Sequence, residues 1–476
     1  MLTTASSRLL RGGLLFWLVW APLPYGSVGD RSVFFLEIGA TALALLAALI
    51  VAADPGRFPR SARTAAALAA CLAGWMALQL VPWPEAWTRV AMPELAESRA
   101  AAASLLGQDV VARSWSLSPP DGMHALWRWL AYVLVACAAT IGFSRTRHLI
   151  LFERVFLLSL GFQAVYGMAE YLSGHQHIWT YAKKFYLGSA TGTFVNRNHF
   201  ASYLALGLPF ALALWARRRS EPVRRRDWRD ALAASLSRAG WIRAVGFSLA
   251  GLAVTAIFLS YSRGGLLAAF VAVSAFAIAG TAGLRRSGRK YGWGWVALFT
   301  LPAVWISFKE LRAPGERFVT AGAENLTTLG QRIPAWRASF DLWPEAWKTG
   351  TGAGTFESAF QSVQPPDVYR HWTHLHNEWI QAGLELGAVG LALVLALAFV
   401  IFRRLWRTAP GPGGRRDAFR AALFAALAGA ALHAFWDFSP KIPGIGFTIA
   451  VLAGLAFSPA LDTEEPVPVP HPRAAG

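Results

Sequence analysis

The run from His371 to Phe402, HWTHLHNEWIQAGLELGAVGLALVLALAFVIF, decides the fold of this chain. Its second half is apolar and long enough to cross a bilayer, because about 20 apolar residues suffice at 1.5 Å per residue in a helix. Its first half crowds five polar side chains into eight residues: His371, His374, His376, Asn377 and Glu378. Ionisable groups at the edge of an apolar span indicate function by default. The sequence therefore predicts a functional histidine cluster where a membrane helix meets water.

The composition of the whole chain agrees with a polytopic integral membrane protein. Of its 476 residues, 55% are hydrophobic and only 15% are charged, and the mean hydropathy is +0.38. Such a composition is typical of chains that cross the membrane many times, so the predicted fold class is all-α with about 12 transmembrane helices. The candidate spans are residues 9–28, 33–52, 64–81, 123–143, 148–172, 198–216, 244–260, 264–283, 292–308, 377–402, 418–436 and 444–459.

The net charge of +18 raises the question of a nucleic-acid partner, and the positions of the charges answer it. Alternate loops are basic, above all residues 217–243, which hold nine arginines and no lysine. Loops rich in Lys and Arg stay on the cytoplasmic side. We therefore expect both termini in the cytoplasm, the other loops on the outer side of the membrane, membrane lipids around the chain and no nucleic acid as partner.

The predicted organisation has three parts. Residues 1–172 hold the first transmembrane helices with an outer loop at 82–122, residues 173–458 form the second membrane domain, and residues 459–476 form a disordered cytoplasmic tail rich in proline. The large outer loop 309–376 should contain short amphipathic helices, because Ile333, Trp336, Phe340 and Trp343 follow helical spacing. The polar side of that helix carries Arg332, Arg337 and Asp341.

Glycines follow that helix in the stretch KTGTGAGTF, residues 348–356. A phosphate-binding loop of the Walker type ends in Gly-Lys-Ser/Thr, which this stretch lacks. We therefore predict a tight turn here, with no role in binding a nucleotide.

Three arginines of the outer segments suit an anionic ligand. Arg263 is preceded by Ser262 and followed by two glycines, which permit close approach, and its planar fork of donors matches phosphate oxygens. Arg197 stands at the start of an outer helix, where free N–H groups favour anions, and Asn196 and Asn198 flank it. Together with Arg332 and His376, they describe an anion site beside a titratable base.

The three histidines also allow a metal-site hypothesis. His371, His374 and His376 could bind zinc, but the sequence shows no obvious acidic second shell and no carboxylate pair at ligand spacing. We therefore predict no metal and no cofactor, with zinc kept as an alternative.

Several motifs resemble one family in the same order. His376-Asn377, nine residues and then Gly387-Ala388-Val389-Gly390 is similar to the H-N-x9-G-x-x-G pattern of the bacterial O-antigen ligase and polymerase superfamily. The stretches GTFVNRNHFASYLAL, Ser-Arg-Gly at 262–264, GQRIPAWRASF with GTGAGTF, and HAFWDFSPKIPG also resemble it, over residues 190–458.

The resemblance implies a glycosyltransferase of the bacterial inner membrane whose active site faces the periplasm. Its donor would be an undecaprenyl-diphosphate-linked glycan, and its acceptor either lipid A-core (ligase) or another lipid-linked glycan (polymerase). The family's diphosphate-binding roles fall on Arg197 and Arg263, and its base on His376. We further expect Arg332 to bind diphosphate and Asn377 to act in catalysis. Asn196, Asn198, Ser262 and Glu378 are expected to support the site.

No residue separates a ligase from a polymerase of O-antigen or exopolysaccharide units, and we favour the ligase. A secondary transporter is the rival from another class, because Gln163, Glu170, Glu385 and Asp437 lie in or near spans. The polar groups gather at one predicted face beside a large loop, which favours an enzyme.

Overall fold

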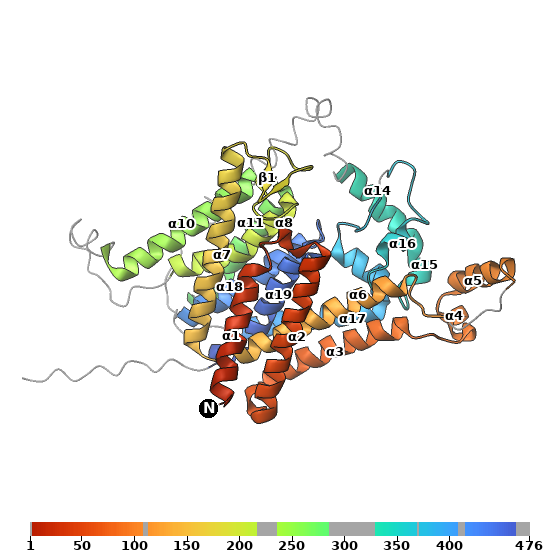
Figure 1. The fold of residues 1–476 in the computed structure, drawn as a ribbon, viewed down its shortest axis with the longest axis horizontal. Helices are drawn as coiled ribbons and strands as arrows, with labels where there is room; N and C mark the ends of the chain where they lie inside the picture. The colour runs from red at the N-terminus through yellow and green to blue at the C-terminus, as the bar shows by residue number, and fades with distance from the viewer. Residues whose placement is uncertain are drawn as a thin grey trace, which may run out of the picture.

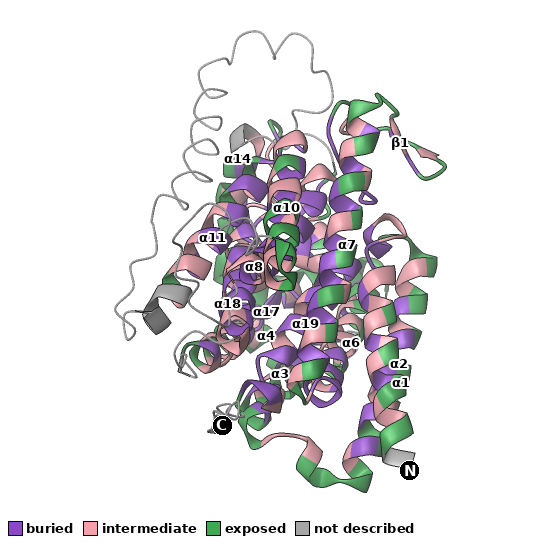
Figure 2. Ribbon diagram, turned by 90° about the vertical axis from the view of Figure 1, so that its left-hand side faces the viewer, coloured by how far each residue is buried: buried purple, intermediate pink, exposed green. Residues whose placement is uncertain are grey.

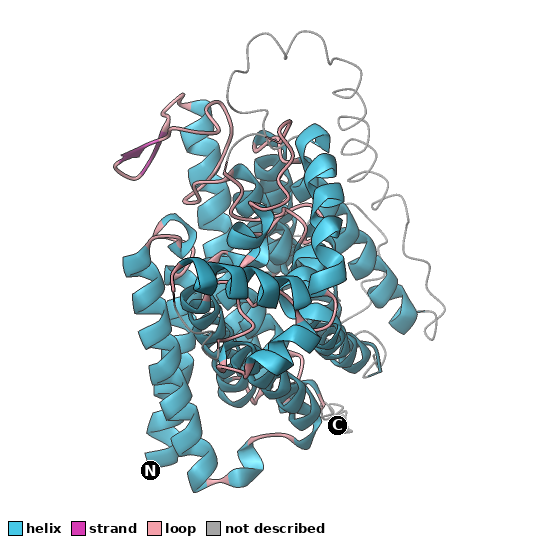
Figure 3. Ribbon diagram, turned by 90° about the vertical axis from the view of Figure 1, so that its right-hand side faces the viewer, coloured by secondary structure: helices cyan, strands magenta, loops and turns pink. Residues whose placement is uncertain are grey.

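The computed structural model describes residues 2–107, 113–216, 236–284, 329–368, 371–407 and 415–462. These residues are mostly helical, as predicted, and Figure 3 shows helices throughout with one small hairpin. The hairpin pairs β1 (His177–Ile178) with β2 (Tyr181–Ala182) in antiparallel register.

One group of helices comes from both ends of the chain (Figure 1). α6 packs on α2, α3 and α19, and α3 packs on α17. The bounds are α1 (Leu2–Trp20), η1 (Tyr25–Ser27), α2 (Asp30–Ala53), η2 (Pro55–Arg57), α3 (Arg60–Leu80), α6 (Pro119–Gly142), α17 (Glu378–Arg407), η6 (Ser439–Lys441), α19 (Pro443–Leu455) and η7 (Pro459–Leu461). α1 ends before Pro22 and Pro24, because proline in a helix interior removes a hydrogen bond and clashes with the preceding turn.

A second group surrounds α8 (Arg197–Trp215), against which α7 (Thr146–Leu172), α10 (Arg238–Leu259), α11 (Arg263–Leu284) and α18 (Arg415–His433) pack. The residues of α8 from His199 to Ala213 are all buried. A helix that is apolar all round belongs in an interior, and Figure 2 shows α8 among α7, α10, α11 and α18.

Short helices cover the end of the bundle at which α6 and α17 begin. α4 (Glu85–Ala91) and α5 (Pro93–Leu105) belong to the predicted outer loop 82–122. α14 (Leu329–Ser339), η5 (Phe340–Leu342), α15 (Trp343–Ala346) and α16 (Phe356–Phe360) belong to the described part of loop 309–376.

Six described helices are long and apolar enough to cross a membrane: α2, α3, α6, α7, α10 and residues 378–406 of α17. Every predicted span except the one at 292–308 falls on a helix of the described chain. The span at 292–308, most of the arginine-rich loop 217–243 and most of the tail 459–476 lie outside the described residues. The count of twelve spans therefore stays a prediction.

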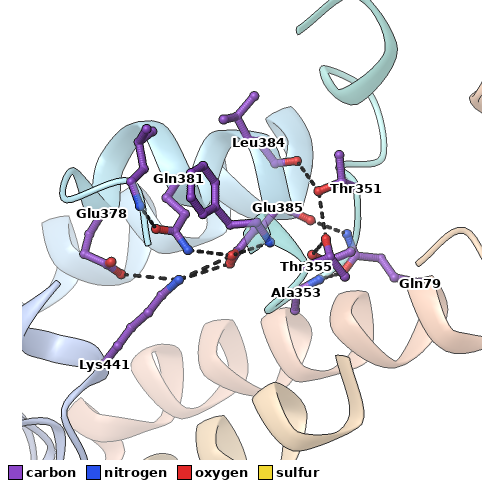
Figure 4. Close-up of polar contacts among 12 residues, drawn as sticks. Gln79, Thr351, Ala353, Thr355, Glu378, Gln381, Leu384, Glu385 and Lys441 are labelled. Atoms are coloured by element: carbon purple, nitrogen blue, oxygen red, sulfur yellow. Dashed lines mark hydrogen bonds and ion pairs between the residues drawn. The ribbon is translucent and has the colours of Figure 1, made fainter. Parts of the chain in front are cut away.

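The glycine-rich stretch is a turn, and it fills a break in α17 (Figure 4). Gly387 has φ 65° and ψ −172°, a conformation essentially restricted to glycine. The break frees carbonyls of α17, so Thr351 N donates to Leu384 O (2.9 Å) and Gln79 Nε2 donates to Glu385 O (2.9 Å). A Cβ at Gly387 would lie 2.5 Å from Lys348 O, so glycine is needed for this close approach. The predicted tight turn is confirmed.

α14 confirms the helix predicted from the spacing around Trp336. The side that packs against the rest of the protein carries Arg332 and Ala335, which are 9% and 0% exposed. Ile333 and Phe340, from the apolar side, are 41% and 53% exposed. The spacing therefore located the helix but not its inward face: of the residues marked as polar, Arg332 is buried, whereas Arg337 and Asp341 are exposed.

Candidate active site

The candidate site is built around Asp437, in the turn that follows α18. Asp437 is 1% exposed, and Ser439 Oγ donates to its Oδ2 at 2.8 Å. Three imidazoles surround this turn. His199 Nε2 lies 3.6 Å from Oδ2, His376 Nδ1 lies 3.4 Å from Oδ1, and His433 Nδ1 lies 3.0 Å from Ser439 Oγ. One buried carboxylate thus joins α8, α18 and the segment before α17.

His376 is held in an unusual backbone conformation. Its φ is 56°, in the left-handed region that side-chain-bearing residues rarely adopt, and such conformations cluster at functional sites. Its Nδ1 faces the Asp437 carboxylate, which selects the tautomer with the proton on Nδ1 and leaves a lone pair on Nε2. The 3.4 Å separation exceeds the ordinary 2.7–3.2 Å range of an N–H···O bond, and catalytic hydrogen bonds often shorten only when substrate binds.

The pKa directions in the site favour a neutral base beside an ionised carboxylate. Burial lowers the pKa of His376 below its ordinary value; Arg332 adds to the decrease and Asp437 opposes it. Burial by itself would raise the pKa of Asp437, but the surrounding imidazoles lower it below its usual range. His376 is therefore neutral at pH 7 and able to accept a proton.

Arg332 is the predicted arginine that lies directly beside His376. Its Nη1 donates to Trp436 O, and its Nη2 lies 3.5 Å from His376 Nδ1. The guanidinium is therefore fixed in position by the same turn that carries Asp437. It places a permanent positive charge next to the proposed base, because arginine stays protonated even when buried.

Arg197 is the first residue of α8, two residues before His199. Its Nη1 donates to Ser189 Oγ at 3.3 Å, and its guanidinium lies 5.4 Å from the centroid of the Tyr186 ring. The loop that supplies Ser189 is held by a buried ion pair between Lys183 Nζ and Glu170 Oε1 at 3.0 Å. This loop therefore fixes Arg197 at the same end of the bundle as Asp437.

Arg263 begins α11, and its neighbours connect it to the site. Ser262 Oγ donates to Asn198 Oδ1 at 2.8 Å, so the two supporting residues predicted at different places in the chain meet. A Cβ at Gly264 would lie 3.1 Å from His433 Nε2, so glycine permits α11 to pack closely on α18. The Arg263 side chain is exposed at this junction.

Two predicted residues, Asn377 and Glu378, do not contact the His376 ring. Asn377 Oδ1 accepts from the backbone N–H groups of Trp379 and Ile380, both at 3.1 Å, as the N-cap of α17. Glu378 Oε2 lies 3.8 Å from Lys441 Nζ. Asn196 is likewise an N-cap, because its Oδ1 accepts from Asn198 N at 2.8 Å. The carboxylate that faces the His376 ring is that of Asp437, at 3.4 Å from Nδ1.

The three histidines of the zinc alternative point to different partners. His371 Nε2 lies 2.5 Å from Glu357 Oε1, and the His374 ring packs on Phe438 with centroids 4.2 Å apart. His376 faces Asp437. Within the described residues, no group of three or more His, Cys, Asp or Glu side chains has the arrangement of a metal site.

Sequence reasoning missed the roles of Asp437, His199, His433 and Ser439. In the sequence, Asp437 stands out only as a polar residue near a span, within the HAFWDFSPKIPG stretch. The available signal was that His433 and Asp437 stand four residues apart at the end of an apolar run. Both belong to the HAFWDFSPKIPG stretch, which also carries the family resemblance.

Comparison with known proteins supports the resemblance over one segment. A family model described as O-antigen ligase matches residues 248–395. The matched segment includes Arg263, Arg332 and His376, whereas Arg197 and Asp437 lie outside it. No curated protein matches the chain. The resemblance to O-antigen ligases is thus confirmed for residues 248–395, and it supports a membrane protein of lipid-linked glycan transfer at the level of the family.

Proposed function

We propose that this protein transfers a glycan from an undecaprenyl-diphosphate-linked donor to an acceptor hydroxyl at the periplasmic face of the bacterial inner membrane. The observation that carries the proposal is that Arg332 and Asp437 both lie beside Nδ1 of His376, at 3.5 Å and 3.4 Å. It combines an anion-binding fork with an oriented neutral base, and glycan transfer from a lipid diphosphate needs both.

The base activates the acceptor. An alcohol is a poor nucleophile until its proton is removed, and His376 Nε2 accepts that proton as the oxygen bonds to the anomeric carbon. Asp437 stabilises the imidazolium that forms, which is the role of a carboxylate behind a catalytic histidine.

The arginines stabilise the leaving group. The bond between the anomeric carbon and the diphosphate oxygen breaks, and the electron pair leaves with the diphosphate. Arg332, Arg197 and Arg263 place fixed positive charge at this end of the bundle, and preorganised donors of this kind stabilise charge as it develops. Donor activation is built into the lipid diphosphate, so the reaction needs no nucleotide.

Replacement of His376 tests the proposal in proteoliposomes that contain undecaprenyl-diphosphate-linked glycan and lipid A-core. We expect His376→Ala to lower turnover by about 10²–10⁴-fold, the value of general-base catalysis, with little change in the KM for donor. His371→Ala is the matched control, because its ring is 59% exposed and paired with Glu357. Turnover of His376→Ala near the wild-type rate, or inhibition by chelators that zinc reverses, would refute the assignment.

The acceptor distinguishes a ligase from a polymerase, and we favour the ligase. A ligase attaches glycan to lipid A-core in the proteoliposomes, whereas a polymerase lengthens the glycan on undecaprenyl diphosphate without lipid A-core. Gel analysis of the products with each acceptor alone separates the two reactions.

A further inference from the structure

A cavity of about 700 Å³ lies between α3, α6, α17, α18 and α19, beside the proposed active site. Its walls are mainly apolar, and its volume is within the range of about 300–1,000 Å³ that is common for ligand pockets. Alanines line it along α3, at Ala62, Ala65, Ala66 and Ala69. Their short side chains leave room that larger apolar residues would fill.

The cavity follows the length of the bundle. Asp121 and Thr140, near opposite ends of α6, both line it. At about 1.5 Å per residue they are roughly 28 Å apart, close to the ~30 Å hydrocarbon thickness of a bilayer. Phe402 and Phe457 line the end away from the active site. The shape therefore suits one extended hydrocarbon chain aligned with the transmembrane helices.

Polar groups line the opposite end, which we call the mouth: Asp121, Arg128, His374, Glu378, Glu385 and Lys441. Lys441 Nζ lies 3.3 Å from Glu385 Oε2 and 3.8 Å from Glu378 Oε2 (Figure 4). Within the described residues, Glu378 Oε1 is buried and has no hydrogen-bond partner. A buried carboxylate oxygen without a donor is costly, and a hydroxyl donor from a ligand would satisfy it.

The charges at the mouth do not suit a diphosphate. Its three carboxylates face two permanent cations, Arg128 and Lys441, and Lys441 is already paired with glutamates. An uncharged sugar fits such a mixed surface, because hydroxyl groups both donate to carboxylates and accept from lysine.

The mouth adjoins the proposed base through the ring of Phe438. His374 lines the cavity, and its ring lies 4.2 Å from that of Phe438, which lies 4.9 Å from that of His376. Arg332 contacts the Nδ1 edge of His376 instead. The base thus lies beside an arginine suited to the donor diphosphate and, through Phe438, adjoins a cavity suited to a different lipid.

We propose that this cavity binds one hydrocarbon chain of the lipid-anchored acceptor, with sugar hydroxyls of its head group at Glu378 and Lys441. The inference rests on the proposed function and names the acceptor's site within it. A chain gains little free energy by moving from lipid into an apolar protein cavity, so the head-group contacts select the lipid.

The two cysteines of the chain allow a direct binding test. Cys137 lines the cavity, whereas Cys71 is exposed on α3 outside it. In a Cys71→Ser protein, N-ethylmaleimide labelling of Cys137 is followed by intact mass in phosphatidylglycerol vesicles. We expect glucosyl diacylglycerol, at about ten times its Kd, to slow labelling about tenfold. Labelling of Cys71 in a Cys137→Ser protein should not change.

Two outcomes of this test overturn the proposal. Protection by undecaprenyl diphosphate in place of the glycolipid would assign the cavity to the donor. If Cys137 is labelled at the same rate with and without glycolipid, the cavity would be assigned to bulk phospholipid. Glu378→Gln should raise the Kd for glycolipid about tenfold, the effect of losing a charge-assisted hydrogen bond, so that the same glycolipid concentration slows labelling only about twofold. Unchanged protection in that variant would refute the head-group contact.

A kinetic test probes the same site and does not depend on labelling of Cys137. Ala398→Phe places a large ring in the cavity, and Ala392→Phe places the same ring on an exposed position of α17 outside it. With lipid A-core as acceptor, we expect Ala398→Phe to raise the acceptor KM about tenfold and to leave the donor KM unchanged. Equal effects of the two variants would refute the cavity assignment. Absence of transfer by the wild-type enzyme would refute the proposed function instead, while the thiol test still reports on the cavity.

Discussion

Replacement of Asp437 by asparagine tests how the base is oriented. The substitution keeps the size of the side chain and the hydrogen bond from Ser439, but it removes the negative charge that lies 3.4 Å from His376 Nδ1. It therefore isolates the electrostatic support of the imidazolium from the packing of the turn.

The expected size of the effect follows from this distance. Two unit charges 3.4 Å apart interact by roughly 5 kcal/mol at an effective dielectric constant of 20. If about half of the charge has developed in the transition state, about 2.5 kcal/mol is lost, which is about 60-fold in rate. Because Asp437 opposes the effect of burial, its loss should also lower the pKa of His376 further.

Turnover measured against pH in proteoliposomes checks both expectations. The base works when neutral, so activity falls as pH drops through the pKa of His376, and the acid limb of Asp437→Asn should move to lower pH. Asp367→Asn is the matched control, because Asp367 is exposed in the outer loop. Near wild-type turnover of Asp437→Asn with an unmoved acid limb would refute the role of Asp437.

Three further predictions concern donor binding, packing and topology. Arg263→Lys keeps the charge but not the planar fork, so the donor KM should rise about tenfold; an unchanged KM would mean that only positive potential matters. Gly387→Ala should lower the free energy of unfolding in detergent by about 1–3 kcal/mol, because its backbone conformation is restricted to glycine. Gly74→Ala, with nothing within 4 Å of the added Cβ, should leave stability nearly unchanged or slightly higher. Reporter fusions should place positions 225 and 410 in the cytoplasm and positions 100 and 345 in the periplasm, and a periplasmic signal at 225 would reverse the orientation.

Properties set by neighbouring residues were accessible from the sequence. Apolar runs located the helices, because the need to satisfy backbone hydrogen bonds in lipid makes a long apolar run helical wherever it lies. The glycine turn was predictable from its residue types, although its place in the break of α17 was not. His376, Arg332 and the Ser262–Gly264 motif were also found from local composition, and the structure brings them to one end of the bundle.

Asn377 carries a local structural signal beside its predicted catalytic role. Asn is among the favoured residues at the position before a helix, and the residues after Asn377 begin the longest described apolar helix. The motif drew attention to Asn377 as a catalytic residue, whereas its Oδ1 is occupied by two backbone donors. A polar residue just before a helix can serve as its N-cap, and the sequence already indicated this role for Asn377.

The tertiary structure alone decided which distant groups meet. Asp437 became the partner of His376 because α18 brings its following turn against the start of α17, and no spacing rule connects residues that far apart. The cavity depends in the same way on how α3, α6, α17, α18 and α19 face one another. A helix in lipid is apolar on every side, so its sequence carries no stripe that marks the face turned toward a neighbour, and only packing reveals it.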